Sequence, residues 1–169
     1  MRDSSLSACT QAVIAAEVGQ LGLAYDYLGE AALVDLDNLQ HNTSDGVHIA
    51  SLAGTWIALV DGFAGLRRQN GTFSFAPRLP EDISRLAFSV LLRGQRLRVE
   101  ITPKHARYLV EDGQALEIVH HGTPLKLSGG KPEQRPIPKL TAGPRPSQPP
   151  GREPAHRGGD RRGGDKPGS

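Results

Sequence analysis

Residues 48–75 read HIASLAGTWIALVDGFAGLRRQNGTFSF, and the spacing of the apolar residues changes within this stretch. In its first part, apolar side chains recur every three or four residues, at Ile49, Leu52, Ala53, Trp56, Ile57, Val60 and Phe63. This spacing places them on one face of a helix, so it predicts a helix over residues 48–64 that ends at Gly65. We expect that face, with Trp56 on it, to be buried as part of a core.

After Arg68 the apolar residues alternate with a period of two. The turn signals are Asn70-Gly71, Gly94-Gln95 and Glu111-Asp112-Gly113, and the alternating apolar residues are Leu86, Phe88, Val90, Leu92, Leu97, Val99, Ile101, Tyr108, Val110, Leu116, Ile118, Leu125 and Leu127. Short alternating segments joined by tight turns are typical of an antiparallel sheet with one buried face. Because the helices precede the strands, we predict an α+β protein that ends in a small antiparallel β-sandwich.

Further helices are predicted before the long one. A helix capped by Ser5 or Ser7 runs to Val18, a second covers residues 21–28 and ends at the glycine that follows it, and a third covers residues 30–36. These helices carry apolar faces without enough partner helices to cover them. The pattern therefore indicates that more helices belong with this segment.

The segment from Lys131 to Ser169 differs in composition from the rest of the 169-residue chain. It holds nine of the thirteen prolines, and its only sizeable apolar residues are Ile137 and Leu140. Such a composition cannot bury enough apolar surface to offset the entropy lost on ordering, so we predict a disordered tail. Nine Lys and Arg against four Asp and Glu make the tail +5, which leaves about −3 for the preceding residues of a chain whose total is +2. A basic tail can contact RNA or anionic lipid, but a solvated tail with no specific nucleic acid partner is the simpler interpretation.

The chain has one cysteine, Cys9, which excludes an internal disulfide and a cysteine-based zinc site. The start of the sequence lacks the apolar core of a signal peptide, and no apolar stretch is long enough to span a membrane. We therefore expect a soluble, cytoplasmic protein. His120-His121 has no third ligand at metal spacing, so no metal site is predicted.

Four stretches together resemble one family. They read DSSLS at residues 3–7, NTSDGVHIASLAGTW at 42–56, GFAGLR at 62–67 and FSFAPRLP at 73–80. Their order and spacing resemble glycoside hydrolase family 65, which includes maltose, trehalose and kojibiose phosphorylases and some hydrolases. The resemblance covers about residues 1–127.

The resemblance implies three regions. Residues 1–68 would be the last helices of an (α/α)6 barrel catalytic domain, residues 69–128 the family's C-terminal β-sandwich, and residues 129–169 the disordered tail. It also implies that the N-terminal domain, most of the barrel and the general-acid glutamate lie outside this sequence. No residue here is therefore assigned a catalytic role.

Phosphate binding is the chemistry that the resemblance leaves in this chain. In the family, the segments that contain Ser4, Ser5, Gly46 and His48 lie near the phosphate site. Each segment precedes a predicted helix, and a helix N-terminus suits an anion because its N–H groups are free and its dipole is positive. The alternative is that the serines and His48 are ordinary helix caps. No cofactor is expected, and inorganic phosphate would be a co-substrate.

Three functional interpretations remain open. In the first, the chain is the C-terminal part of an enzyme that cleaves α-glucosidic disaccharides by inverting phosphorolysis or hydrolysis. It is inactive alone because it lacks the general-acid glutamate. Alternatively, it is the end of an active enzyme whose remainder, including the N-terminal part of the barrel, is encoded upstream of Met1. The third interpretation is a non-catalytic interaction module or remnant that forms homo-oligomers through its exposed helices.

Overall fold

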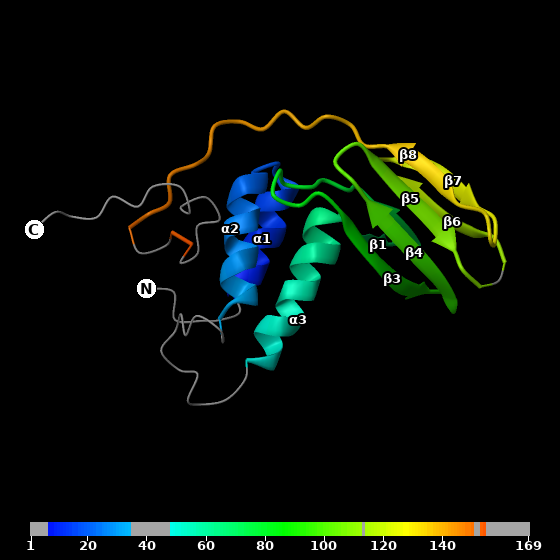
Figure 1. Ribbon diagram of the computed structural model, residues 1–169, viewed down its shortest axis with the longest axis horizontal. Coiled ribbons are helices and arrows are strands. Elements are labelled where there is room, and N and C mark those ends of the chain that lie inside the picture. The colour runs from blue at the N-terminus through cyan, green and yellow to red at the C-terminus, as the bar shows by residue number, and fades with distance from the viewer. Residues whose placement is uncertain (1–6, 35–47, 113, 151–152, 155–169) are drawn as a thin grey trace, which may run out of the picture.

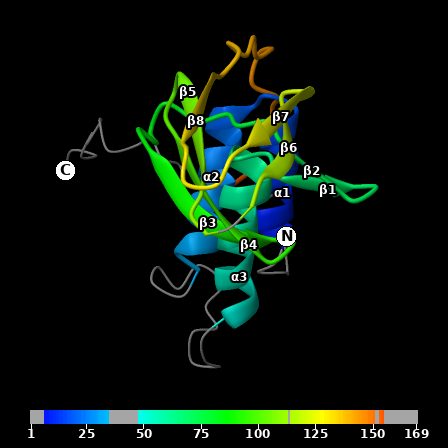
Figure 2. The same ribbon diagram turned by 90° about the vertical axis from the view of Figure 1, so that its right-hand side faces the viewer.

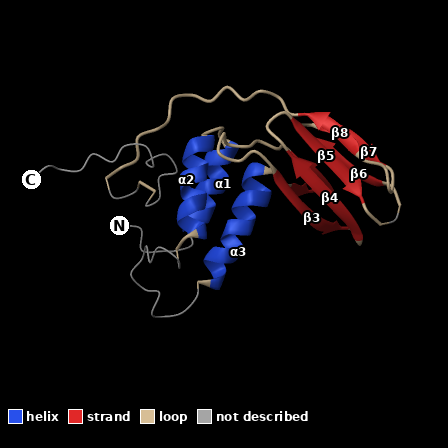
Figure 3. Ribbon diagram, viewed as in Figure 1, coloured by secondary structure: helices blue, strands red, loops and turns tan. Residues whose placement is uncertain are grey.

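The computed structural model describes residues 7–34, 48–112, 114–150 and 153–154. Within these ranges the helices gather on one side and the strands on the other, as Figures 1 and 3 show. The helices are α1 (Ser7–Glu17), α2 (Leu21–Ala32), α3 (Ile49–Ile57) and the π-helix η2 (Ala58–Phe63), which continues α3 directly. None of the helices in the described ranges is both long and apolar enough to cross a bilayer.

The prediction that the second helix ends at Gly29 is wrong. The helix continues through this glycine to Ala32, so the separate third helix predicted from residue 30 does not exist within the described residues. Glycine inside a helix costs only about 1 kcal/mol relative to alanine. Leu28 and Ala31, on either side of Gly29, are buried, and the free energy gained by burying them exceeds that cost. Residues 35 and 36, at the end of the predicted third helix, lie outside the described residues.

The burial of α3 also differs from the expectation. Its buried residues are the small Ser51 and Gly54, whereas Ile49 is 75% exposed and Trp56 is 49% exposed. The reason is the close approach of α1, because a Cβ at Gly54 would lie 2.7 Å from the Cys9 sulfur. Only small side chains fit there, so the bulky face of α3 points away from α1 and α2. Trp56 is therefore not a core residue.

Eight strands follow the helices in the described part of the chain. They are β1 (Arg67–Gln69), β2 (Thr72–Phe75), β3 (Leu86–Leu92), β4 (Gln95–Ile101), β5 (His105–Val110), β6 (Leu116–His120), β7 (Thr123–Leu127) and β8 (Glu133–Pro136). They form two four-stranded sheets with the orders β1-β2-β6-β7 and β3-β4-β5-β8. Figure 2 shows the two sheets side by side from the strand end of the molecule.

The predicted alternation of the strands is confirmed. In β4, for example, Leu97, Val99 and Ile101 are fully buried while Arg96 and Arg98 are exposed. The buried faces of both sheets contribute to a single apolar core. Across the two sheets, the rings of Phe75 and Tyr108 lie 5.4 Å apart between centroids.

One strand pair departs from the antiparallel prediction. β2 and β6 run parallel, with Ser74 opposite Val119 and Phe75 opposite His120. A parallel pair needs a long connection between its strands. The chain supplies that connection with β3, β4 and β5, which form three of the four strands of the other sheet before the chain returns to β6.

The predicted disorder is wrong for the first part of the tail. Glu133–Pro136 forms β8, which pairs antiparallel with the edge of β5, and Ile137 packs against the sheet core. A sheet edge offers unpaired N–H and C=O groups whatever the composition of the segment that meets them. Residues 151–152 and 155–169 lie outside the described residues.

Candidate functional site

Of the four residues implied in phosphate binding, only His48 lies within the described residues. Ser4, Ser5 and Gly46 lie outside them. His48 is half-buried and immediately precedes α3, where its carbonyl accepts hydrogen bonds from the backbone N–H groups of Ser51 (2.9 Å) and Leu52 (3.1 Å). His48 is thus the N-cap residue of α3.

Helices α1 and α3 run parallel, so both begin at the same end of the helical layer. Gly54 meets Cys9 near the start of α1, and Gly62 meets Val13 and Ala16 further along the same helix. Figure 1 shows the two helices side by side in this orientation. Two positive helix N-termini therefore point toward one end of the molecule. The predicted phosphate residues directly precede these two helix starts in sequence.

The end of α2 is joined to the start of α3. The Ser51 hydroxyl, fully buried, donates a hydrogen bond of 2.9 Å to the Ala31 carbonyl. Next to Ala31, the Glu30 side chain is buried. A buried carboxylate must be paired or hydrogen-bonded, so Glu30 is a polar residue of this end that sequence reasoning missed.

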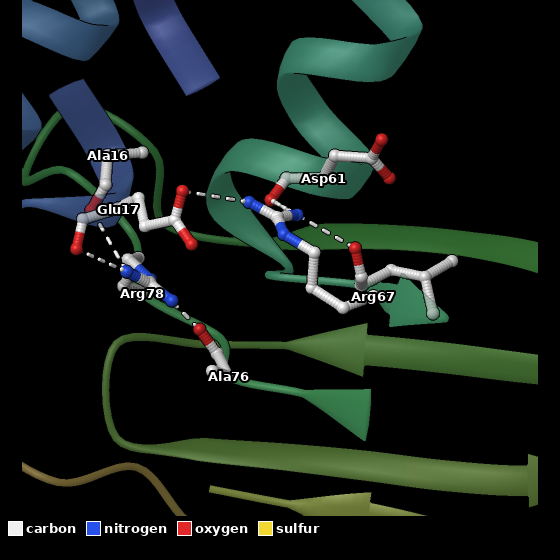
Figure 4. A network of polar contacts seen from close by, with 7 residues as sticks. Ala16, Glu17, Asp61, Arg67, Ala76 and Arg78 are labelled. Atoms are coloured by element: carbon white, nitrogen blue, oxygen red, sulfur yellow. Dashed lines mark hydrogen bonds and ion pairs between the residues drawn. The ribbon is translucent and has the colours of Figure 1, made fainter. Parts of the chain in front are cut away.

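Two arginines join the other end of the helices to the sheets (Figure 4). Arg78 donates from Nη1 to the carbonyls of Ala16 (3.1 Å) and Glu17 (3.0 Å), and from Nε to the carbonyl of Ala76 (2.9 Å). The first two carbonyls end α1, where a cation also favours the helix dipole. Burial lowers the pKa of Arg78, and the Glu17 carboxylate opposes this shift.

Arg67 makes the second link. Its Nη1 donates to the carbonyls of Asp61 and Leu66, both at 2.8 Å, and its Nη2 lies 3.4 Å from the Glu17 carboxylate. Burial raises the pKa of the Asp61 carboxyl, while Arg67 acts in the opposite direction. Both guanidinium groups are thus held by backbone carbonyls at the C-terminal ends of α1 and η2. They orient the helices on the sheets, and they lie away from the helix starts.

His120 is the other buried polar residue of note. Its Nε2 lies 3.0 Å from the Pro136 carbonyl, and its Nδ1 lies 2.8 Å from the Tyr108 hydroxyl. Burial lowers the pKa of His120, and it also lowers that of the adjacent His121. Because both ring nitrogens of His120 have partners within the fold, this histidine is not available to ligate a metal. In the described part of the chain no group of three His, Cys, Asp or Glu residues could hold a metal ion.

Comparison with protein families gives two matches. The family model described as the glycosyl hydrolase family 65 central catalytic domain matches residues 1–57. The model described as the C-terminal domain of the same family matches residues 66–127. The two matches follow each other in the chain as the helices and the sheets do.

Curated relatives agree with these matches. An uncharacterized glycosyl hydrolase of Mycobacterium leprae is 52% identical over 163 residues, which cover 93% of this chain and 20% of that protein. An alpha,alpha-trehalose phosphorylase of Geobacillus stearothermophilus is 39% identical over 130 residues, which cover 77% of this chain and 17% of that protein. The chain therefore spans about a fifth of the length of the relatives it matches.

A solved structure gives the same result for the fold. A candidate kojibiose phosphorylase from the human microbiome matches with a TM-score of 0.74 and 25% identity, over 80% of this chain and 19% of that one. The fold, the two consecutive family matches and the curated relatives all lead to the same family. The chain belongs to glycosyl hydrolase family 65.

Proposed function

We propose that the chain is the C-terminal part of an enzyme that cleaves α-glucosidic disaccharides of the trehalose, maltose or kojibiose type by inverting phosphorolysis or hydrolysis. Its helices are then the last helices of an (α/α)6 barrel, and the general-acid glutamate lies outside the 169 residues. In this proposal the chain alone is inactive, and the enzyme is cytoplasmic.

The family matches support the activity in this proposal, and the exposed face of α3 carries the inference that further barrel helices pack against the chain. Ile49, Leu52, Trp56 and Ile57 all lie on it, and each is at least 46% exposed. Contiguous apolar patches on a soluble protein mark surfaces that other elements cover. Further helices of the barrel would cover this face, and the small residues opposite it would keep α3 close to α1.

The phosphate site of the proposed enzyme would lie at the starts of α1 and α3. Ser4, Ser5, Gly46 and His48 would hold inorganic phosphate with hydroxyl, amide and imidazole groups, supported by the two helix dipoles. Phosphate would then attack the anomeric carbon while the acid supplied by the rest of the barrel protonates the leaving oxygen. Hydrolysis would instead use a second carboxylate and a water.

The test compares two proteins. One is the chain itself, and the other includes whatever family sequence is encoded in frame upstream of Met1. Both are incubated with trehalose, maltose and kojibiose, with and without phosphate. We expect sugar release from the longer protein only. Release of glucose or glucose 1-phosphate by the chain alone would contradict the proposal.

His48 tests the phosphate site within the longer protein. We expect His48→Ala to raise the KM for phosphate about tenfold, the effect of losing one hydrogen bond to a charged group. Arg96→Ala, on the exposed outer face of β4, is the control and should leave KM unchanged. An unchanged KM for phosphate in His48→Ala would assign His48 to helix capping alone.

A second candidate function rests on the same exposed face. The chain would be a non-catalytic module that self-associates through α3, with the apolar side chains of two copies in contact. Sedimentation of the chain should then show a dimer or larger species, and Leu52→Glu should shift it to monomer. A chain that is monomeric at all concentrations and melts cooperatively would refute this second function.

A further inference from the structure

The segment after β8 returns to the helices. We call residues 138–150 the C-terminal strap. The strap begins beside an anchored residue, because the Ile137 N–H donates to the Lys104 carbonyl (2.8 Å) and the Ile137 side chain packs on the sheet core. In Figure 1 the strap, coloured orange, passes over the helix ends and continues on the far side of α2. It thus spans the helical and sheet parts of the molecule.

Polar contacts hold the strap on α2 and on the residue before it. The Gln20 amide donates to the carbonyls of Gly143 (3.2 Å) and Pro144 (3.3 Å). The Tyr27 hydroxyl donates to the Gln148 side chain at 3.2 Å. Each contact joins two residues more than a hundred positions apart in sequence, and the strap contributes both backbone and side-chain atoms.

The strongest contact is an ion pair. Arg145 Nη2 lies 2.5 Å from Asp26 Oδ2, and the Asp26 side chain is only 7% exposed. A charge-assisted hydrogen bond to a buried carboxylate is stronger than an ordinary one, because little water competes for it. Replacing Arg145 would remove this charged partner from the buried Asp26 carboxylate, whereas the Arg145 side chain is half-exposed to water.

The strap also lies against an apolar groove. This groove is lined by Ile14, Ala15, Val18, Leu23 and Tyr27 of the helical layer and by Pro146 and Gln148 of the strap. Grooves with an aromatic wall accept proline-rich segments, whose backbone loses little entropy on binding because proline fixes φ. The prolines that favoured a prediction of disorder therefore also lower the entropic cost of docking this segment.

We propose that the α1–α2 face is a recognition surface for a proline-rich segment that carries an arginine. The chain's own residues 142–148 occupy this surface and tie the helical layer to the sheet domain. Charge favours the pairing, since the segment carries Arg145 and the α1–α2 face carries Asp26. The proposal is independent of the catalytic role and concerns the chain whether or not it cleaves sugars.

Limited digestion of the full chain with trypsin tests the proposal. Within the strap, Lys139 is followed by Leu140 and can be cleaved, whereas Arg145 is followed by proline and resists. Anchors at Ile137 and Gly143 flank the exposed Lys139 site, so release of the strap should let this segment fit the protease more readily. We expect Asp26→Asn and Arg145→Ala to accelerate this cleavage about tenfold or more, the effect expected for loss of a charged hydrogen bond.

Cleavage after Lys126, in β7, reports unfolding of the sheets and is followed in the same digest. Faster cleavage at Lys139 alone in the variants supports the proposal. Cleavage at Lys139 at the same rate in wild type, Asp26→Asn and Arg145→Ala would overturn it. Arg96→Ala is the matched control and should change neither rate. If Asp26→Asn accelerates cleavage at both Lys126 and Lys139, the Gln20→Ala variant is used instead, because it removes only a half-exposed amide and should leave the fold intact. A several-fold faster cleavage of Gln20→Ala at Lys139 alone then supports the proposal. An unchanged rate at Lys139 overturns it.

Discussion

The hydrogen bond between Tyr108 and His120 allows a sharp test of how the sheet core is stabilised. A carbonyl only accepts hydrogen bonds, so His120 Nε2 carries a proton and donates it to the Pro136 carbonyl. Nδ1 of the neutral ring is then the acceptor for the Tyr108 hydroxyl at 2.8 Å. The Tyr108 side chain is fully buried, and burial raises the pKa of its hydroxyl, which therefore keeps its proton.

Tyr108→Phe removes the hydroxyl and changes the volume of the side chain very little. It leaves Nδ1 of His120, which is 6% exposed, without its donor. An unsatisfied buried acceptor costs about 1–3 kcal/mol. For a domain of this size that corresponds to a fall in Tm of about 3–10 °C.

Thermal unfolding followed by circular dichroism at neutral pH measures this fall. Tyr25→Phe is the matched control, because Tyr25 is half-buried and no hydrogen bond of its hydroxyl is found among the described residues. We expect the control to melt as the wild type does. A Tyr108→Phe protein that melts within about 1 °C of the wild type, a shift worth only a few tenths of a kcal/mol, would refute the assigned hydrogen bond.

Three further predictions concern stability. Burial lowers the pKa of His120 and His121 below the ordinary 6.5, so the unfolded chain binds more protons at low pH. A melting series should show a level Tm above about pH 7 and a falling Tm from about pH 7 to 5. A flat profile over that range would contradict their burial as neutral rings. Gly65→Ala should cost about 2 kcal/mol or more in urea unfolding, since φ is +62° and the new Cβ would lie 2.5 Å from the Ala76 carbonyl oxygen. Arg78→Met should cost about 2 kcal/mol by the same assay, because it removes the donor to two α1 carbonyls; a loss below about 0.5 kcal/mol would show that water replaces it.

The strands were predictable because their pattern is local. Leu97, Val99 and Ile101 alternate with arginines over a few residues, and that alternation places them on one face of β4 without reference to the rest of the fold. The turn at Asn70-Gly71 is likewise local, since both residues have positive φ. The family motifs are also read from consecutive residues.

The direction in which α3 faces was not predictable from its pattern. The apolar stripe indicates which residues share a face, but not which neighbour covers them. Here Gly54 and Ser51 meet α1 and α2, because close packing of helices selects the small face. The bulky face of α3 stays largely exposed, although the Trp56 ring lies 5.9 Å from the Phe88 ring between centroids.

The tail shows the same limit. Its composition predicts disorder, yet β5 offers an open edge to Glu133–Pro136, and Asp26 offers a buried charge to Arg145. The candidate site is split in the same way, because Ser4, Ser5, Gly46 and His48 come from sequence resemblance, whereas the parallel course of α1 and α3 comes from packing.

By itself, the sequence determined strands β3 to β7 and their buried faces, the positions of α1 and α3 to within a few residues, and membership of the family. These depend on the period of apolar residues and on turn chemistry, which act between near neighbours. The tertiary structure alone decided the parallel β2–β6 pair, the partners of His120 and the course of the strap. Each of these joins residues far apart in the chain, and the free energy that selects them exists only after the chain has folded.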